Sequence, residues 1–448
     1  RARPSLLSSA SQDHNYRGFF NLGVIILVVT NFRMIMENLL KYGLLLGLPS
    51  LDSRYDWSSF RPNDWPCTLG ILQMQVHVCI ALGLEQLALV ETFGDTTTAV
   101  LHGINLTAQL GGATWLVWAH PAVTSAAGLI FMLIAVTLWL KLVSWAHVNR
   151  DLRLAARDQV QGGGRRGARE GSGHGPLYAQ AAEFDAQVQD VEAKETSRLS
   201  YPENLTFTNI YYFWFAPTLS YQLNYPRSDR ISRSVVLGLL ARICIFSALM
   251  VFVIQQYMLP AAEHSVVHVV EGNYVRMVER VLVMAVPSTY IWLLGFYVFF
   301  HLYMNLLAEL LRFGDREFYK DWWNSTSFEA YWRLWNMPVH HWIVRHAYFP
   351  LQRMGCGKNL ATLGVFFLSA VLHELVISVP FKMVRLYAFL GMMGQIPLMI
   401  STKYLESSMK EKSQAGNVIF WVIFCILGQP MALLLYYIDF CKTITSDH

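Results

Sequence analysis

Uncharged apolar stretches of bilayer length recur along this chain and constrain its fold more than any other feature. About 20 apolar residues span the hydrocarbon core of a membrane. Charged residues make up only 15% of the chain, whereas soluble proteins carry about 25%. The pattern therefore predicts an all-α, polytopic integral membrane protein. It excludes a soluble enzyme, a disordered protein and a fibre, and it argues against a transmembrane β-barrel, whose strands alternate apolar and polar residues.

The sequence offers about nine candidate transmembrane helices. They cover residues 18–46, 67–91, 99–118, 121–140, 235–260, 281–308, 360–381, 386–402 and 416–438. The third candidate is the weakest, because it contains His102, Asn105 and Gln109.

Basic residues gather in two stretches between these spans. Residues 147–233 contain eleven Lys and Arg and residues 311–358 contain seven, whereas 47–66 and 261–280 contain two each. Cytosolic loops carry the excess of Lys and Arg in membrane proteins. The distribution predicts a cytosolic amino-terminal arm (1–17), first membrane helices (18–146), a cytosolic loop (147–233) and a membrane core (234–448) that includes the cytosolic loop 311–358.

Three other features of the sequence do not predict a binding site. The Gly/Arg-rich stretch 161–176 lacks the GxxxxGK[ST] continuation of a phosphate-binding loop, so it is interpreted as a disordered linker. The six cysteines show no paired short spacing, and no cluster has metal-ligand spacing, so neither a metal site nor a disulfide framework is predicted. The net charge of +4 reports topology rather than binding to nucleic acid.

The loop 311–358 is long but does not have the composition of a disordered segment. Trp322, Trp323, Trp332 and Trp335 fall within fourteen residues, and histidines and arginines alternate with aromatic residues around them. Such a segment is typical of short amphipathic helices along the membrane interface. A simple aromatic belt would explain the tryptophans, but it explains the neighbouring Asn, His, Arg and Asp residues poorly.

His373 and Glu374 form the most conspicuous polar pair inside a predicted span. Ionisable residues within a membrane are costly and are therefore candidates for function. A neutral imidazole accepts a proton near neutral pH and suits a general base. Adjacent helical residues point about 100° apart, so Glu374 is expected to anchor the helix rather than orient His373. The structural alternative for His373 is a histidine that bridges two helices by hydrogen bonds.

Other polar residues within the spans carry weaker predictions. His301, His77 and Glu85 are expected to pack between helices or line a tunnel, and Gln395 and Gln429 to hydrogen-bond between helices or line a cavity. The sequence has no GxSxG motif and no Cys beside a His. Direct transfer therefore fits better than an acyl-enzyme route: a histidine deprotonates an acceptor hydroxyl while a polar group stabilises the oxyanion.

The sequence resembles the membrane-bound O-acyltransferase superfamily, and within it the type-1 diacylglycerol O-acyltransferases. The FYKDWWN stretch at 318–324 matches the FYxDWWN motif of the eukaryotic sterol and diacylglycerol enzymes, in Phe318, Tyr319, Asp321, Trp322, Trp323 and Asn324. Further similar stretches are FAPTLSYQLNYPRS (215–228), NMPVHHWIVRH (336–346) and SAVLHELVISVP (369–380). The resemblance covers most of residues 15–440.

This resemblance implies an enzyme that transfers a fatty acyl group from acyl-CoA to diacylglycerol. His373 would be the general base, Asn336 would hold the acyl thioester, and Glu374, Gln429 and Gln395 would give polar support in the reaction chamber. Acyl-CoA would be a co-substrate, with no cofactor. The residues implied in binding it are Trp332, Trp335, Asn336, Val339, His340, Tyr348 and Lys358. His341 departs from the family, where animal relatives tend to carry Lys.

The family further implies an endoplasmic reticulum membrane protein that forms homodimers or homotetramers, with the arm 1–17 contributing to association. Two other interpretations stay open on the sequence. One keeps the enzyme class but changes the acceptor to a sterol or a long-chain alcohol. The other is a transporter that uses His373 and Glu374 as a proton relay, although the hydropathy shows no inverted repeat.

Overall fold

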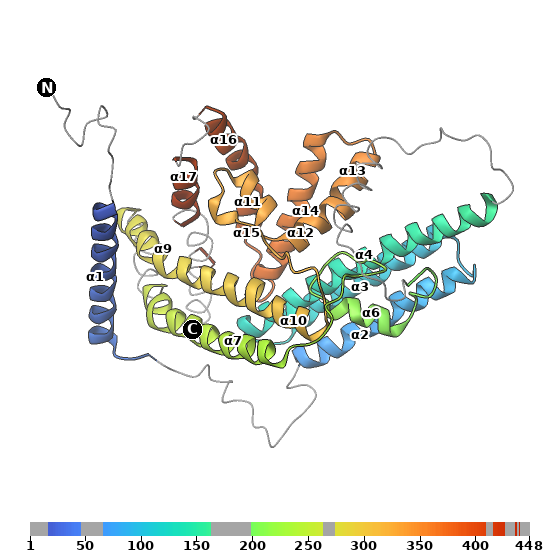
Figure 1. The fold of residues 1–448 in the computed structure, drawn as a ribbon, viewed down its shortest axis with the longest axis horizontal. Helices are drawn as coiled ribbons and strands as arrows, with labels where there is room; N and C mark the ends of the chain where they lie inside the picture. The colour runs from blue at the N-terminus through green and yellow to red at the C-terminus, as the bar shows by residue number, and fades with distance from the viewer. Residues whose placement is uncertain are drawn as a thin grey trace, which may run out of the picture.

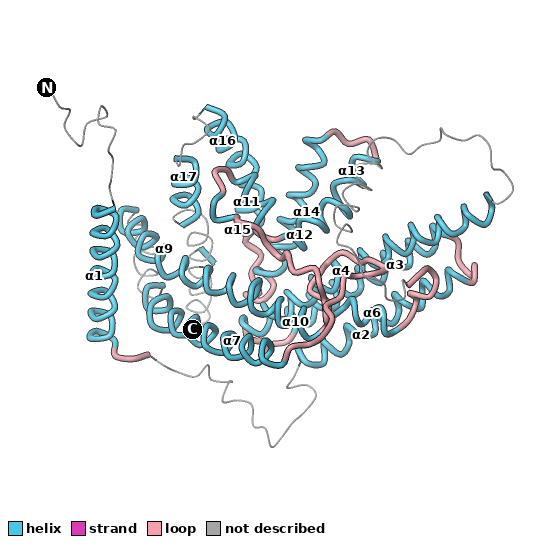
Figure 2. Tube along the Cα trace, in the orientation of Figure 1, coloured by secondary structure: helices cyan, strands magenta, loops and turns pink. Residues whose placement is uncertain are grey.

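The computed structural model describes residues 17–45, 66–162, 199–262, 274–408, 415–425, 435–436 and 439. Within these ranges the chain is helical and forms no strand, only an isolated bridge between Arg227 and Phe313 (Figure 2). The predicted arm 1–17 and the linker 161–176 lie almost entirely outside the described residues.

The helices in the first half of the chain are α1 (Arg17–Tyr42), α2 (Pro66–Leu89), α3 (Asp95–Ala119), α4 (Ser125–Gly162), α6 (Phe207–Phe215) and α7 (Arg233–Val253). The helices that follow are η3 (Ile254–Met258), α9 (Tyr274–Phe296), η4 (Tyr297–Tyr303), α10 (Met304–Leu310), η5 (Trp322–Asn324), α11 (Phe328–Leu334) and α12 (Met337–Ile343). The last are η6 (Val344–Tyr348), α13 (Phe349–Arg353), α14 (Lys358–Ser378), α15 (Tyr387–Met393), α16 (Gln395–Ser408) and α17 (Ala415–Ile423). Figure 1 shows their arrangement.

Each of the nine predicted spans contains helix, and the prediction of a polytopic helical membrane protein is confirmed. Five described helical stretches are both long and apolar enough to cross a membrane: Pro66–Leu89, Ser125–Arg157, Arg233–Ala262, Val281–Leu310 and Lys358–Ser378. The predicted span 386–402 is broken instead into α15 and α16, which meet at Gly394.

Helices α2, α3 and α4 lie side by side and share one hydrophobic core, as Figure 1 shows. The face of α3 that packs into this core carries Thr98, His102, Asn105 and Gln109, all buried. The ring Nδ1 of His77 lies 2.8 Å from Asn105 Oδ1, and Gln109 donates to the Ala135 carbonyl at 3.1 Å. The weak hydropathy of this span therefore comes from a polar inner face.

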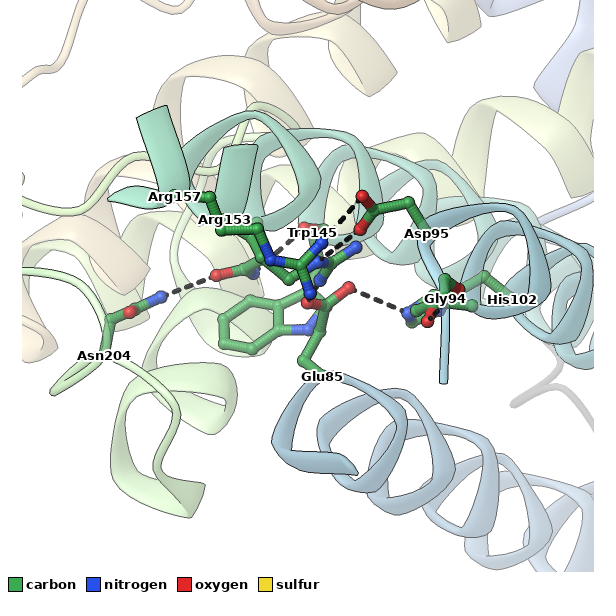
Figure 3. Close-up of polar contacts among 10 residues, drawn as sticks. Glu85, Gly94, Asp95, His102, Trp145, Arg153, Arg157 and Asn204 are labelled. Carbon is green, nitrogen blue, oxygen red and sulfur yellow. Dashed lines mark hydrogen bonds and ion pairs between the residues drawn. The ribbon is translucent and has the colours of Figure 1, made fainter. Parts of the chain in front are cut away.

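Helix α4 extends well beyond the predicted span 121–140, and it crosses the expected loop boundary at residue 147 to end at Gly162. The reason is a buried ion network at its carboxyl-terminal end (Figure 3). Arg153 donates to Glu85 and to Asp95, the latter at 3.0 Å, and Arg157 donates to Asp95 at 2.8 Å. His102 donates to Glu85 at 3.0 Å. Basic residues that indicated a loop thus have acidic partners on α2 and α3.

The second part of the predicted loop 147–233 also packs against the helices. Lys141 of α4 is buried and donates to the carbonyls of Phe213 (2.8 Å) and Ala216 (2.7 Å), which lie where α6 ends. Tyr221 is fully buried, and its backbone N–H donates to Ser144 Oγ at 2.8 Å. Residues 199–232 are therefore an ordered layer over α4.

Helices α7 and α9 pack together and continue through η3 and η4. A cavity of about 380 Å³ lies between them, with an apolar lining of Phe246, Leu249, Val253, Tyr290, Leu293, Leu294 and Tyr297. Gln256 in η3 is fully buried, and its side chain donates to Asn38 Oδ1 (2.7 Å) and to the Gly43 carbonyl (2.9 Å). One glutamine thus ties the end of α1 to the rest of the chain.

Candidate active site

The aromatic loop 311–358 folds into the short helices η5, α11, α12, η6 and α13, as the sequence predicts. Trp322, Trp332 and Trp335 build a cluster rather than a loose belt. Trp322 is buried with Phe328, Tyr331, Phe420 and Phe424, and Trp332 and Trp335 pack around them. The loop is therefore a rigid layer held by aromatic packing.

The FYKDWWN motif is part of this layer, through Trp322 and Tyr319. Phe318 and Trp322 are buried, whereas Asp321, Trp323 and Asn324 are exposed. Tyr319 shares a hydrogen bond of 2.8 Å with His301 of η4. The backbone matters as much as the side chains, because Lys320 N donates to the Leu334 carbonyl at 2.8 Å and Met337 N donates to the Phe318 carbonyl at 3.0 Å. These bonds fix the turn between α11 and α12.

Asn336 lies in that turn and is the N-cap of α12. Its side-chain Oδ1 accepts from Val339 N at 3.1 Å, which satisfies one of the free amides at the start of the helix. The cap occupies the oxygen and leaves the amide nitrogen with no hydrogen-bond partner among the described residues. The cap therefore fixes the side chain of Asn336 with its amide nitrogen available as a hydrogen-bond donor.

His373 lies in the second half of α14 and its side chain is exposed on the described chain. Ring Nδ1 is 2.7 Å from the Ser369 carbonyl and 3.3 Å from Ser369 Oγ. A carbonyl oxygen only accepts, so Nδ1 carries the proton and Nε2 keeps the free lone pair. The helix backbone thus selects the tautomer that a general base at Nε2 needs. The ring has no hydrogen bond to a neighbouring helix among the described residues.

Glu374 is buried, and its carboxylate contacts neighbouring parts of the chain. Its carboxylate accepts from Leu386 N (2.9 Å), Phe389 N (3.1 Å) and the hydroxyl of Tyr436 (2.9 Å to each oxygen). These donors belong to the start of α15 and to the carboxyl-terminal segment. The expected anchoring role of Glu374 is confirmed by these contacts.

The structure describes one of the two predicted glutamines, Gln395. Gln395 is partly buried at the start of α16 and donates to the Gly391 carbonyl at 3.3 Å, a local contact. Gln429 lies outside the described residues.

The residues implied in acyl-CoA binding lie on α11, α12, the turn between them, η6 and the start of α14. Trp332 packs on Phe366, with ring centroids 6.3 Å apart, and joins a cluster with Ala370 one turn before His373. Val339 packs near Trp342 and Leu368, the latter on α14. Tyr348 accepts from Gln352 at 3.0 Å, and Lys358 is exposed. The packing thus places the aromatic layer beside the helix that carries His373.

His340 does not contribute a positive charge at neutral pH. Burial, reinforced by the nearby His341, Arg333 and Lys320, lowers the pKa of His340 to about 4. Burial also lowers the pKa of His341, although Asp315 and Glu317 act in the opposite direction. Both side chains therefore offer hydrogen bonds, and the fixed cations near the loop are its arginines and lysines.

Sequence reasoning missed one group in this layer. His346 is buried in η6, its Nε2 lies 2.8 Å from Ser144 Oγ, and its Nδ1 lies 3.3 Å from His147 Nδ1. Because Ser144 also accepts from Tyr221 N, one serine connects α4, the 199–232 layer and η6. The sequence held one signal for this group: His147 and His346 each lie in an apolar stretch of their own segment.

The sequence has clear relatives. The profile of the membrane-bound O-acyltransferase family matches residues 101–438. "Diacylglycerol O-acyltransferase 1" of Corylus americana is 42% identical over 440 residues, which cover 98% of this chain and 75% of that protein. The Arabidopsis thaliana protein of the same name is 41% identical over 442 residues (98% and 76%), and that of Dictyostelium discoideum is 37% identical over 441 residues (98% and 64%).

The chain belongs to the membrane-bound O-acyltransferase family. The relatives within this family to which it is similar carry the name diacylglycerol O-acyltransferase 1, and the chain spans about three quarters of the length of the first two.

Proposed function

We propose that this protein is an acyl-CoA:1,2-diacylglycerol O-acyltransferase that makes triacylglycerol. The observation that carries the proposal is His373, a histidine in an apolar helix whose Nδ1–H is committed to the Ser369 carbonyl. Nε2 is then the one basic nitrogen of the His373 ring. Similarity to diacylglycerol O-acyltransferases along nearly the whole chain supports this acceptor.

In the proposed reaction, Nε2 of His373 removes the proton from the free hydroxyl of diacylglycerol. The oxygen attacks the thioester carbonyl carbon of acyl-CoA, and the amide N–H of Asn336 donates to the developing oxyanion. When the intermediate collapses, the C–S bond breaks. The CoA thiolate takes the proton back from the imidazolium, so that triacylglycerol and CoA thiol leave. No acyl-enzyme forms.

We further propose the endoplasmic reticulum membrane as the location, with the amino terminus and the loops 147–233 and 311–358 facing the cytosol. The excess of Lys and Arg in those loops supports this orientation. Coenzyme A is polyanionic and cytosolic, so the arginines and lysines of loop 311–358 lie on the side where it arrives. The family resemblance supports a homodimer or homotetramer.

The test is turnover by purified protein in nanodiscs, with labelled oleoyl-CoA and diacylglycerol, for the wild type and His373→Ala in parallel. Lipid products are separated by thin-layer chromatography. We expect triacylglycerol from the wild type and at least a 100-fold lower rate from the variant, because general-base catalysis contributes about 10²–10⁴-fold. Near-normal turnover by His373→Ala would refute the mechanism.

Competing acceptors test the substrate. A sterol and a long-chain alcohol are added with diacylglycerol in equal amounts. Triacylglycerol should be the main product. If a steryl ester or a wax ester is the main product instead, the acceptor is a sterol or a long-chain alcohol and the enzyme class stays the same.

A further inference from the structure

The turn between α14 and α15 contains a group of hydrogen bonds that the proposed reaction does not use. They connect Glu374, Tyr436 and the first amides of α15. We propose that Glu374 and Tyr436 are a pair of positioning residues, which fix the rotation of α14 and thereby the direction of the His373 ring. This inference rests on the proposed function, since it assigns the two residues a role in that reaction.

Three donor groups surround the carboxylate of Glu374. Oε1 accepts from Leu386 N and from the Tyr436 hydroxyl, each at 2.9 Å. Oε2 accepts from Phe389 N at 3.1 Å and lies 2.9 Å from the same hydroxyl. An ionised carboxylate is an acceptor only, and these are all donors. Glu374 is 6% exposed, so little of it is left for a substrate.

The start of α15 explains why a side chain from another helix is needed there. The first amides of a helix have no partner within it. Leu386, the N-cap, has φ of 60° and offers no side-chain cap. The amides of Leu386, Ala388 and Phe389 are satisfied instead by Glu374 and by the Tyr436 hydroxyl, which accepts from Ala388 N at 3.3 Å. Glu374 thus caps α15 from α14.

This cap bears on His373 because the two residues are adjacent on α14. They point about 100° apart, one into the packed junction and the other toward the exposed face. Ser378 Oγ also donates to the Glu374 carbonyl at 2.7 Å. If the anchor is lost, rotation of this turn moves the imidazole away from the acceptor hydroxyl. A displacement of about 1 Å at a reacting group can cost about 10²-fold in rate.

A second hydrogen bond in the same junction supplies a matched control. Tyr387 donates to Asp439 Oδ2 at 2.9 Å, and Arg385 Nε lies 3.1 Å from the same oxygen. Tyr387→Phe therefore removes one tyrosine hydroxyl that connects α15 to the carboxyl-terminal segment. It leaves both oxygens of Glu374 with their donors, so it separates general loosening of the junction from loss of the Glu374 anchor.

The experiment measures kcat and KM for oleoyl-CoA on the full chain in nanodiscs. The variants are Tyr436→Phe, Glu374→Gln, the double variant and Tyr387→Phe. Tyr436→Phe should lower kcat by roughly 10-fold to 100-fold and leave KM essentially unchanged. The double variant should be no slower than the slower single variant, because both changes break the same anchor. Tyr387→Phe should resemble the wild type.

Three results would overturn the inference: a normal kcat for Tyr436→Phe, losses that multiply in the double variant, or an equal loss in Tyr387→Phe. If Glu374→Gln yields no folded protein, Glu374→Asp takes its place in the same cycle, since it keeps the charge but shortens the reach. Triacylglycerol synthesis by the wild type is measured in every series. Its absence would refute the proposed function, whereas its presence with a normal Tyr436→Phe would refute only the positioning role.

Discussion

The ion network of α2, α3 and α4 makes a quantitative prediction for Arg153→Met. Arg153 is 4% exposed in its side chain and Glu85 is fully buried. The substitution keeps much of the side-chain volume but leaves Glu85 without its guanidinium partner. Removing one partner of a buried ion pair costs about 3–5 kcal/mol. His102 still donates to Glu85 at 3.0 Å, so part of the hydrogen bonding of the carboxylate remains and we expect the lower end, about 3 kcal/mol.

A loss of this size is measurable by thermal unfolding. For a large domain, 1 kcal/mol corresponds to about 2 °C in Tm, so Arg153→Met should lower the Tm in detergent by about 6 °C. The double variant Glu85→Gln with Arg153→Met should recover most of the loss, since an uncharged pair of similar volume is often neutral. Arg150→Met is the control. Arg150 is exposed on the same helix, and its change should stay within about 0.5 kcal/mol.

The reasoning would be refuted by an unchanged Tm for Arg153→Met. It would also be refuted if the double variant were as unstable as the two single losses added together. Additive losses would mean that the two residues do not interact energetically, and the cost of Arg153→Met would then not come from leaving Glu85 without its partner.

Two further predictions concern packing and pH. Gly70→Ala should cost about 1–3 kcal/mol, because the added Cβ would lie 2.5 Å from the Phe131 ring, whereas Gly83→Ala on the same helix meets nothing within 4 Å and should gain about 0.5–1 kcal/mol. Thermal unfolding of both variants checks this, and equal effects would contradict it. In the folded protein the pKa of His340, about 4, is below the ordinary 6.5. The contribution of neutral His340 to the free energy of unfolding is therefore complete above pH 6.5 and is lost as the pH falls toward 4. We expect a loss of about 2 kcal/mol at pH 5, seen as a steeper fall of Tm with acid than in His340→Gln; parallel curves would contradict it.

Hydropathy located the membrane helices because burial in lipid acts on each segment separately. It could not give the end of α4, since the partners of Arg153 and Arg157 are Glu85 and Asp95, on helices far away in sequence. A count of Lys and Arg along the sequence assigns a segment with such residues to a loop.

The candidate site shows the same division. His373 was predictable, because a histidine within an apolar run is costly wherever the chain folds. The contacts of Glu374 were not, because its donors lie 12, 15 and 62 residues further along the chain. The supporting role of the FYKDWWN motif was also hidden, because two of the bonds that fix the α11–α12 turn are between backbone groups.

The polar inner face of α3 has a consequence for how the protein is made. Each segment leaves the translocon according to its own free energy of transfer into lipid, in which uncompensated polar groups count against entry. Among the described residues, His102, Asn105 and Gln109 of α3 find partners on α2 and α4, in the contacts of His102 with Glu85, of Asn105 with His77 and of Gln109 with Ala135. We therefore expect α3 to be retained beside its neighbours during synthesis and to partition into the bilayer together with them, as one preassembled unit of three helices.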